Sequence, residues 1–125
     1  MNITYLKDVA SYQIEAWWKK LLKSFPSAGG VPSFTINNRL KTTAGRAFYL
    51  DGKIDLSAEL FWEYTEEFCK DTIPHELAHI VAWRIFKDPG HGKGWKTVMR
   101  SIGLEPARLH KMVNTKHAAR RAGAL

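Results

Sequence analysis

Cysteine is almost absent from this sequence, since Cys69 is the only one among 125 residues. A single cysteine excludes an internal disulfide and a four-cysteine zinc ribbon, so any metal site must use histidines and carboxylates. No apolar run reaches the roughly 18 residues of a membrane-spanning helix, and the N-terminal residues lack the pattern of a signal peptide. We therefore expect an intracellular, cytoplasmic protein without a membrane partner. With 45% hydrophobic and 12% aromatic residues, the chain should pack one core.

Acidic residues are scarce in the C-terminal third. Residues 84–125 carry ten Lys or Arg and two Asp or Glu, net +8, whereas residues 1–83 carry nine and ten, net −1. Concentrated positive charge indicates a polyanionic partner, with nucleic acid favoured because phosphate binding releases counterions. A solvated basic face explains the charge as well. The candidate phosphate-binding residues are Arg108, Lys111, Lys116, Arg120 and Arg121.

Helical periodicity marks the N-terminal part. Large apolar residues from Ile14 to Phe25 fall on one side of a helix, and Pro26 ends the pattern. Ser57 is the expected N-cap of a short helix that runs toward Tyr64.

Short strands are expected between these two helices. Asp51-Gly52 predicts a type I′ turn, because both central positions of that turn need a positive φ. The pattern favours an α+β fold, a single small domain with a short antiparallel sheet. The three expected strands cover residues 34–36, 47–50 and 53–56.

A helix from Pro74 to Phe86 is the most informative element. Its residues are apolar almost all round, which predicts a central, buried helix. Asp88-Pro89-Gly90 then breaks the chain. A second packed helix is expected from Trp95 to Ile102, with a C-terminal basic helix or tail over residues 107–125.

The central helix carries the motif His75-Glu76-Leu77-Ala78-His79. Residues four apart in a helix differ by about 40° in direction and about 6 Å in rise, so both imidazoles can face one metal ion. Zinc is the expected ion, because nitrogen ligands and tetrahedral geometry suit it. The alternative is a pair of hydrogen-bonded core histidines, but a buried apolar helix makes unpaired polar groups costly.

His91 is the best candidate for a third ligand. Pro89-Gly90 lets the chain turn back, and Gly92 and Gly94 should permit a close approach to the metal. The alternative for His91 is a solvent-exposed loop histidine.

Glu76 is the expected general base. It lies about 100° round the helix from His75, so it can reach a zinc-bound water rather than the ion. Glu76 would accept the proton of that water during attack on a peptide carbonyl and then protonate the leaving amine. The alternative is an acidic residue that only stabilises the first helical turn.

Several further segments resemble the SprT-like zinc metalloproteases, which include the Spartan proteases that act on DNA–protein crosslinks. The resemblance covers about residues 10–105. It implies a zincin-like domain, the zinc ligands His75, His79 and His91, and Glu76 as the base. Many members continue into a cysteine-rich zinc ribbon that helps engage DNA, and because Cys69 is the only cysteine here, we expect a short form without this ribbon. The segments that carry the resemblance are Asn38-Arg39-Leu40, Thr43-Ala44-Gly45-Arg46-Ala47, Ile54-Asp55-Leu56-Ser57, the HELAH helix, and His91-Gly92 followed by Trp95 and Met99.

These features predict a zinc metalloendopeptidase with one Zn²⁺, formed by a protease domain over residues 1–106 and the basic segment over 107–125. Its expected substrates are DNA-associated or DNA-crosslinked proteins, with DNA bound through the basic C-terminal third. A role in crosslink repair and an association with the nucleoid would follow. A nucleic-acid-binding module with a structural zinc is the alternative, although structural sites usually have four protein ligands. A zinc hydrolase of a non-peptide bond would use the same chemistry.

Two questions stay open at this level. Arg46, Tyr49 and Tyr64 are each candidates to approach a cleft, with no ground for choosing among them. The acidic stretch from Glu59 to Asp71 is either a counterpart of the basic end or a solvated face, and the solvated face is the simpler expectation.

Overall fold

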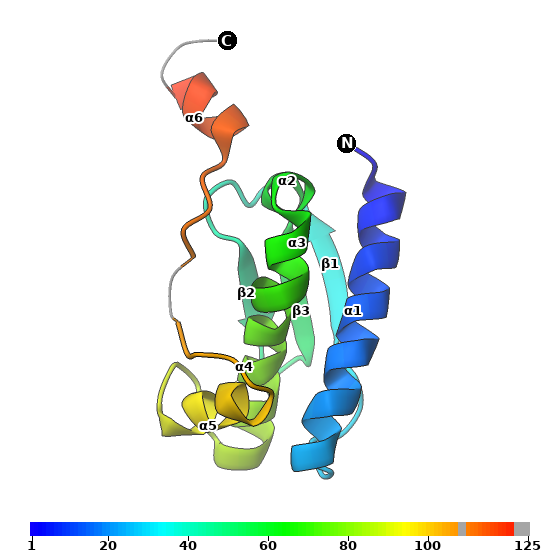
Figure 1. Cartoon of the computed structure of the whole chain (residues 1–125), viewed down its shortest axis with the longest axis vertical. Coiled ribbons are helices and arrows are strands. Elements are labelled where there is room, and N and C mark those ends of the chain that lie inside the picture. The colour runs from blue at the N-terminus through cyan, green and yellow to red at the C-terminus, as the bar shows by residue number, and fades with distance from the viewer. Residues whose placement is uncertain (108–109, 122–125) are drawn as a thin grey trace.

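The computed structural model describes residues 1–107 and 110–121. It is an α+β domain in which α1 and α4 lie on the same side of a three-stranded sheet (Figure 1). No helix among the described residues is both long enough and apolar enough to span a membrane. The elements in chain order are α1 (Ile3–Ser24), β1 (Ser33–Asn37), β2 (Gly45–Phe48), β3 (Lys53–Ser57), α2 (Ala58–Glu63), α3 (Thr65–Glu67), the π-helix η1 (Phe68–Thr72), α4 (Ile73–Phe86), α5 (Lys93–Ser101) and α6 (Thr115–Arg121).

The N-terminal helix is longer than its apolar pattern predicted. It begins at Ile3 because the Asn2 side chain caps it, accepting a hydrogen bond from Tyr5 N at 2.9 Å. Leu6 and Ala10 extend the buried stripe toward the N-terminus. The predicted cap of the short helix is confirmed, since Ser57 Oγ accepts a hydrogen bond from Leu60 N at 3.2 Å.

The sheet is mixed, with the strand order β1-β3-β2, and the prediction of a wholly antiparallel sheet is wrong. The strand β1 pairs with β3 in parallel, because the chain crosses over between them, whereas β2 and β3 form an antiparallel hairpin. The prediction of a type I′ turn at Asp51-Gly52 is also wrong. Of Asp51 and Gly52, only Gly52 has a positive φ, of 64°, because the loop between β2 and β3 has four residues, a length usually built on a type I turn.

The central helix α4 has the burial that its sequence predicted. Its side chains pack with those of α1 and with β3, where Ile54 and Leu56 point into the core. Pro74 stands in its first turn, and Lys87 ends the helix in the left-handed conformation. The core therefore fixes both the axis and the rotation of the helix that carries the HExxH motif.

The segment after α5 does not lie free. Gly103, with a φ of 79°, turns the chain, and the described residues between Gly103 and α6 have no regular secondary structure and lie along the body (Figure 1). We call its described residues, 104–107 and 110–114, the strap. Met112 and Leu104 pack against the core.

Candidate metal centre

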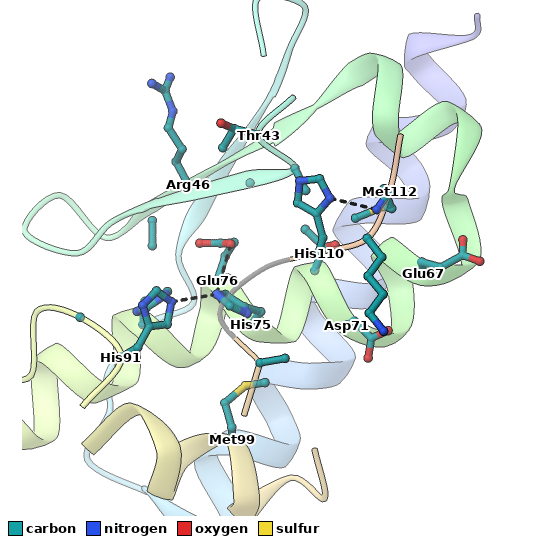
Figure 2. Close-up of a pocket in the computed structure, with 18 of the residues that line it drawn as sticks. Thr43, Arg46, Glu67, Asp71, His75, Glu76, His91, Met99, His110 and Met112 are labelled. Carbon is teal, nitrogen blue, oxygen red and sulfur yellow. Dashed lines mark hydrogen bonds and ion pairs between the residues drawn. The ribbon is translucent and has the colours of Figure 1, made fainter. Parts of the chain in front are cut away.

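Helix α4 and the loop after it bring three histidines together. The Nε2 atom of His91 lies 3.1 Å from Nε2 of His79 and 3.3 Å from Nε2 of His75. Figure 2 shows His75 and His91 pointing toward each other, with Glu76 beside them. The structure thus assembles the three residues that the sequence singled out, and together they could hold a metal ion.

The spacing of these nitrogens fits one tetrahedral ion. Two nitrogens at the usual zinc distance, about 2.05 Å, are about 3.3 Å apart when the angle at the ion is tetrahedral. The observed 3.1 and 3.3 Å are close to this separation. Three imidazoles would leave a fourth position for a solvent or substrate oxygen, which is the arrangement of a catalytic rather than a structural site.

The loop that carries His91 is shaped by Asp88. Its carboxylate accepts hydrogen bonds from Gly90 N at 2.9 Å and from Trp95 N at 3.0 Å. A Cβ on Gly92 would lie 2.9 Å from Asp88 Oδ2, and one on Gly94 would lie 2.8 Å from Cβ of Phe86. The glycines therefore allow a close approach to the end of α4, and not to the metal site as the sequence suggested.

Trp95 forms the floor of the histidine cluster. Its indole is fully buried and contacts all three imidazoles, with ring centroids 4.5 to 5.3 Å apart. The backbone of Gly90 favours the protonated form of His79, and that of Ala107 favours the protonated form of His75, in each case against the larger effect of burial.

Burial and mutual proximity keep the imidazoles of His75 and His79 neutral. Desolvation, followed by the charge of a neighbouring imidazole, lowers the pKa of His75 to about 4. The same causes lower the pKa of His79 to about 3. Their nitrogen lone pairs are therefore available to a metal at neutral pH.

Glu76 lies beside the cluster and is 7% exposed. Its Oε2 atom is 3.9 Å from Nε2 of His75. Burial raises the pKa of Glu76 to about 8. A Cβ on Gly45 would lie 2.9 Å from Cγ of Glu76, so β2 approaches this carboxylate as closely as glycine allows. The position of Gly45 in the sequence gave no sign of this contact.

A cavity of about 1100 Å³ opens over the three histidines. Strand β2 lines one side of it, and η1 and the strap line the other (Figure 2). Arg46, Tyr49 and Tyr64 all line the cavity, so each candidate left open by the sequence reaches it. His110 lines it too and was missed, because it lies in a segment that the sequence described only as a basic tail.

The predicted phosphate-binding residues have different surroundings. Lys111 lines the cavity, Lys116 is exposed, and Nη2 of Arg120 lies 3.4 Å from Oε2 of Glu59. Arg108 and the side chain of Arg121 lie outside the described residues. The ion pair of Arg120 also shows that the acidic stretch is in part an internal counterpart of the basic end, so the expectation of a solvated face is wrong for Glu59.

Comparison with known proteins agrees with these features. Residues 13–117 match the SprT-like family. A protein named Protein SprT from Photorhabdus laumondii is 42% identical over 83 residues, covering 64% of this chain and 43% of that protein. Its namesakes from Vibrio parahaemolyticus and Escherichia coli are 36% identical over 91 residues and 37% identical over 90, each covering 71% of this chain and 52% of the relative. The chain spans about half the length of these curated relatives. No solved structure matches it.

Proposed function

The chain belongs to the SprT-like family, and from this premise we propose that it is a zinc metallopeptidase that hydrolyses peptide bonds in DNA-associated proteins. The observation that carries the proposal is the convergence of three Nε2 atoms, 3.1 and 3.3 Å apart, beside the carboxylate of Glu76. A site with three nitrogen ligands and an adjacent carboxylate leaves a position open for water and therefore suits hydrolysis, whereas a closed structural site leaves none.

Glu76 is the proton carrier in this mechanism. Zinc held by the three histidines would supply Lewis-acid chemistry, polarising a carbonyl and making water more acidic. The Glu76 carboxylate accepts a proton from the attacking water and delivers it to the amine nitrogen that leaves when the C–N bond breaks. Burial alone keeps much of this carboxyl protonated at neutral pH, with its pKa near 8. A divalent charge in the three-histidine site would favour its ionised form.

Strand β2 supports the binding of an extended peptide. It lies at the edge of the sheet and pairs with β3 alone among the described strands. Its residues line the cavity next to Glu76. A polypeptide added to this edge by backbone hydrogen bonds would pass over the three histidines. Because backbone groups make these bonds, binding would depend little on the sequence of the polypeptide.

The charge distribution supports DNA as the partner that brings substrates close. Residues 84–125 carry a net charge of +8. Lys116 is exposed on α6, and Lys111 lies at the cavity. Proteins bound to DNA would be concentrated at the cleft by such a surface.

Replacing Glu76 by Gln tests the peptidase. We expect zinc content and fold to be retained and cleavage of a basic DNA-binding protein to fall by about 100-fold or more, since general base catalysis contributes about 10²–10⁴. The matched control is Glu15→Gln on the exposed face of α1, which removes the same charge far from the site. Cleavage at the wild-type rate by the Glu76 variant would contradict the assignment.

The same assay with and without single-stranded DNA tests the partner. DNA-stimulated, Glu76-dependent cleavage supports the whole proposal, whereas DNA-independent cleavage keeps the peptidase and removes the DNA. Zinc and DNA binding with no Glu76-dependent cleavage would favour a nucleic-acid-binding module.

A further inference from the structure

One face of the sheet has no helix packed on it. The helices α1 and α4 lie on the opposite face, and none of the helices that the structure describes lies on this outer face (Figure 1). Successive side chains of a strand alternate between the two faces. On β2, Ala47 packs against the core, so Arg46 and Phe48 lie on the outer face. Figure 2 shows Arg46 pointing away from Glu76.

An aromatic ring and two cations lie together on this face. The guanidinium carbon of Arg46 is 5.4 Å from the centroid of the Phe48 ring, and Nζ of Lys53, the residue of β3 that pairs with Phe48, is 5.7 Å from it. Both distances are near the outer limit of about 6 Å for a cation–π contact, so neither cation lies flat on the ring. The side chains of Arg46 and Lys53 are 47% and 41% exposed. We call these three residues the outer cluster.

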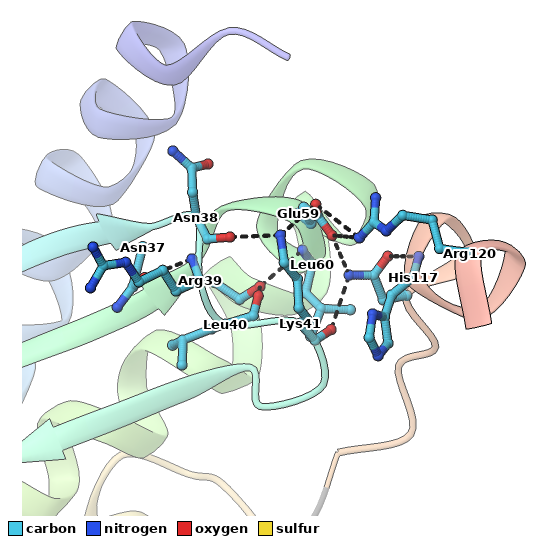
Figure 3. Close-up of polar contacts among 11 residues, drawn as sticks. Asn37, Asn38, Arg39, Leu40, Lys41, Glu59, Leu60, His117 and Arg120 are labelled. Atoms are coloured by element: carbon cyan, nitrogen blue, oxygen red, sulfur yellow. Dashed lines mark hydrogen bonds and ion pairs between the residues drawn. The ribbon is translucent and has the colours of Figure 1, made fainter. Parts of the chain in front are cut away.

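An acidic side chain of the same face is buried beneath the cations. Asp55 is 4% exposed, and its Oδ2 accepts hydrogen bonds from Arg46 Nη2 and Asn37 Nδ2, each at 3.0 Å. Its Oδ1 lies 3.8 Å from Lys53 Nζ, so two exposed cations share one buried carboxylate. Arg39 is exposed beside Asn37, just after β1, and adds a further positive charge (Figure 3). The surface that this cluster offers to a ligand is therefore positive.

These groups match the chemistry of single-stranded DNA. An unpaired base can stack on an accessible aromatic ring, and every base can do so because each has a π face. Cations beside the ring can bind the phosphates that flank the base. A duplex fits this surface less well because its bases are already stacked and paired, and an acidic peptide would use the charges but not the ring.

We propose that the outer face of the sheet binds single-stranded DNA, with a base stacked on Phe48 and phosphates bound by Arg46 and Lys53. The inference rests on the DNA partner of the proposed function, and it assigns that partner to a surface other than the basic C-terminal residues. Strand β2 would then carry DNA on its outer face and a polypeptide at its edge. A protein bound to the DNA would be kept within reach of Glu76.

Binding of a fluorescent oligo(dT) to the full chain tests the inference, measured by anisotropy over a range of salt concentrations. We expect Phe48→Ala to weaken binding by about 5- to 150-fold, the contribution of one stacked base. Lys53→Gln should reduce the dependence of log K on log salt by about 0.7, because one phosphate contact is lost. The matched controls on α1 are Tyr12→Ala and Lys7→Gln, whose side chains are exposed. Both controls should bind as the wild type does.

Photocrosslinking shows whether the DNA touches the outer cluster. An oligonucleotide that contains 5-iodouracil should crosslink to Phe48 in the wild type, as located by mass spectrometry of the digested protein. If Phe48→Ala does not fold, this crosslink and the Lys53 variant carry the test. Poly-glutamate, which has charge without bases, should compete weakly, and competition as strong as that of unlabelled oligo(dT) would overturn the inference.

Two further outcomes separate this inference from the proposed function. Wild-type affinity in a folded Phe48→Ala, with binding lost in Lys116→Gln, would overturn the outer face as the site and leave DNA at the C-terminal residues. A wild-type chain that binds no oligonucleotide would overturn the DNA partner as well. The peptidase itself is judged separately, by the cleavage rate of Glu76→Gln.

Discussion

The two sides of the cavity are held in place by different kinds of interaction. Strand β2 is held by its hydrogen bonds to β3 and by the apolar core beneath the sheet. The strap has no regular secondary structure and is held by side chains such as Asn114 and Tyr64. One side therefore depends on regular pairing and burial, and the other on a few polar contacts between distant parts of the chain. The two sides should respond differently to mutation and to pH.

The largest effect is expected on the strand side. Leu56 on β3 is fully buried. Leu56→Ala should lower the free energy of unfolding by about 2–5 kcal/mol, because it removes apolar contacts and leaves a cavity. Urea denaturation measures the change, and Leu50→Ala is the control, since Leu50 is 76% exposed. If Leu56→Ala and Leu50→Ala lowered the free energy of unfolding by the same amount, burial in the sheet would not be what stabilises this side of the cavity.

A smaller structural change on the same side should have a large catalytic effect. Gly45→Ala places a Cβ 2.9 Å from Cγ of Glu76 and 3.2 Å from its Oε2 atom, so either the strand or the carboxylate must move. We expect the rate of peptide cleavage to fall by about 10- to 100-fold, as a catalytic group moved by about 1 Å loses its alignment. Zinc affinity should stay near wild type, because the three atoms nearest to a Cβ at Gly45 belong to Glu76 and Asp55 and not to a histidine of the cluster.

The control for this prediction is Gly30→Ala. No atom lies within 4 Å of a Cβ at Gly30, so the added methyl group meets open space. Equal rates for Gly45→Ala and the wild type would show that Glu76 tolerates displacement and would weaken its role as the base.

The difference between the two sides also explains what the sequence could predict. The HExxH helix, its burial and the N-cap at Ser57 followed from local patterns, and the structure has them. His91 could be paired with the motif because Pro89-Gly90 follows the helix closely in sequence. Each of these features rests on residues near one another in the chain.

The features that the sequence missed rest on distant contacts. The parallel pairing of β1 with β3 depends on a crossover that no alternation of apolar residues reveals. Asn114 bonds Lys41 across 73 residues, and His110 bonds Thr42 across 68. A polar residue in a basic tail has no pattern that distinguishes a buried hydrogen bond from a solvated side chain. The metal-binding role of the three histidines stays a prediction until an ion is measured.

The smallest effect is expected when the pH is lowered, and it concerns the stability of the strap side of the cavity. Burial alone would raise the pKa of Glu59, but hydrogen bonds from Asn114 and Lys41, with the charges of Lys41 and Arg120, lower it to about 2. A carboxyl whose pKa is lower in the folded state stabilises the fold above its ordinary value of 4.5 and loses that contribution as the pH falls toward 2. The difference in stability between the wild type and Glu59→Gln should therefore be largest above pH 4.5 and shrink toward pH 2.

Metal-free protein is the right sample for this measurement, because bound zinc would add its own pH dependence. Subtracting the Glu59→Gln curve removes the contribution of buried histidines, which is common to both proteins. The control is Glu66→Gln, since Glu66 pairs with Lys70 on the surface, where both side chains are mostly exposed and water weakens the interaction. The protection of the Val113 amide against hydrogen exchange, relative to the unfolded rate at the same pH, should fall on acidification before that of the β3 amides. Simultaneous loss of protection at Val113 and in β3 would mean that the strap and the sheet open as one unit, and that the two sides of the cavity differ in their contacts but not in their stability.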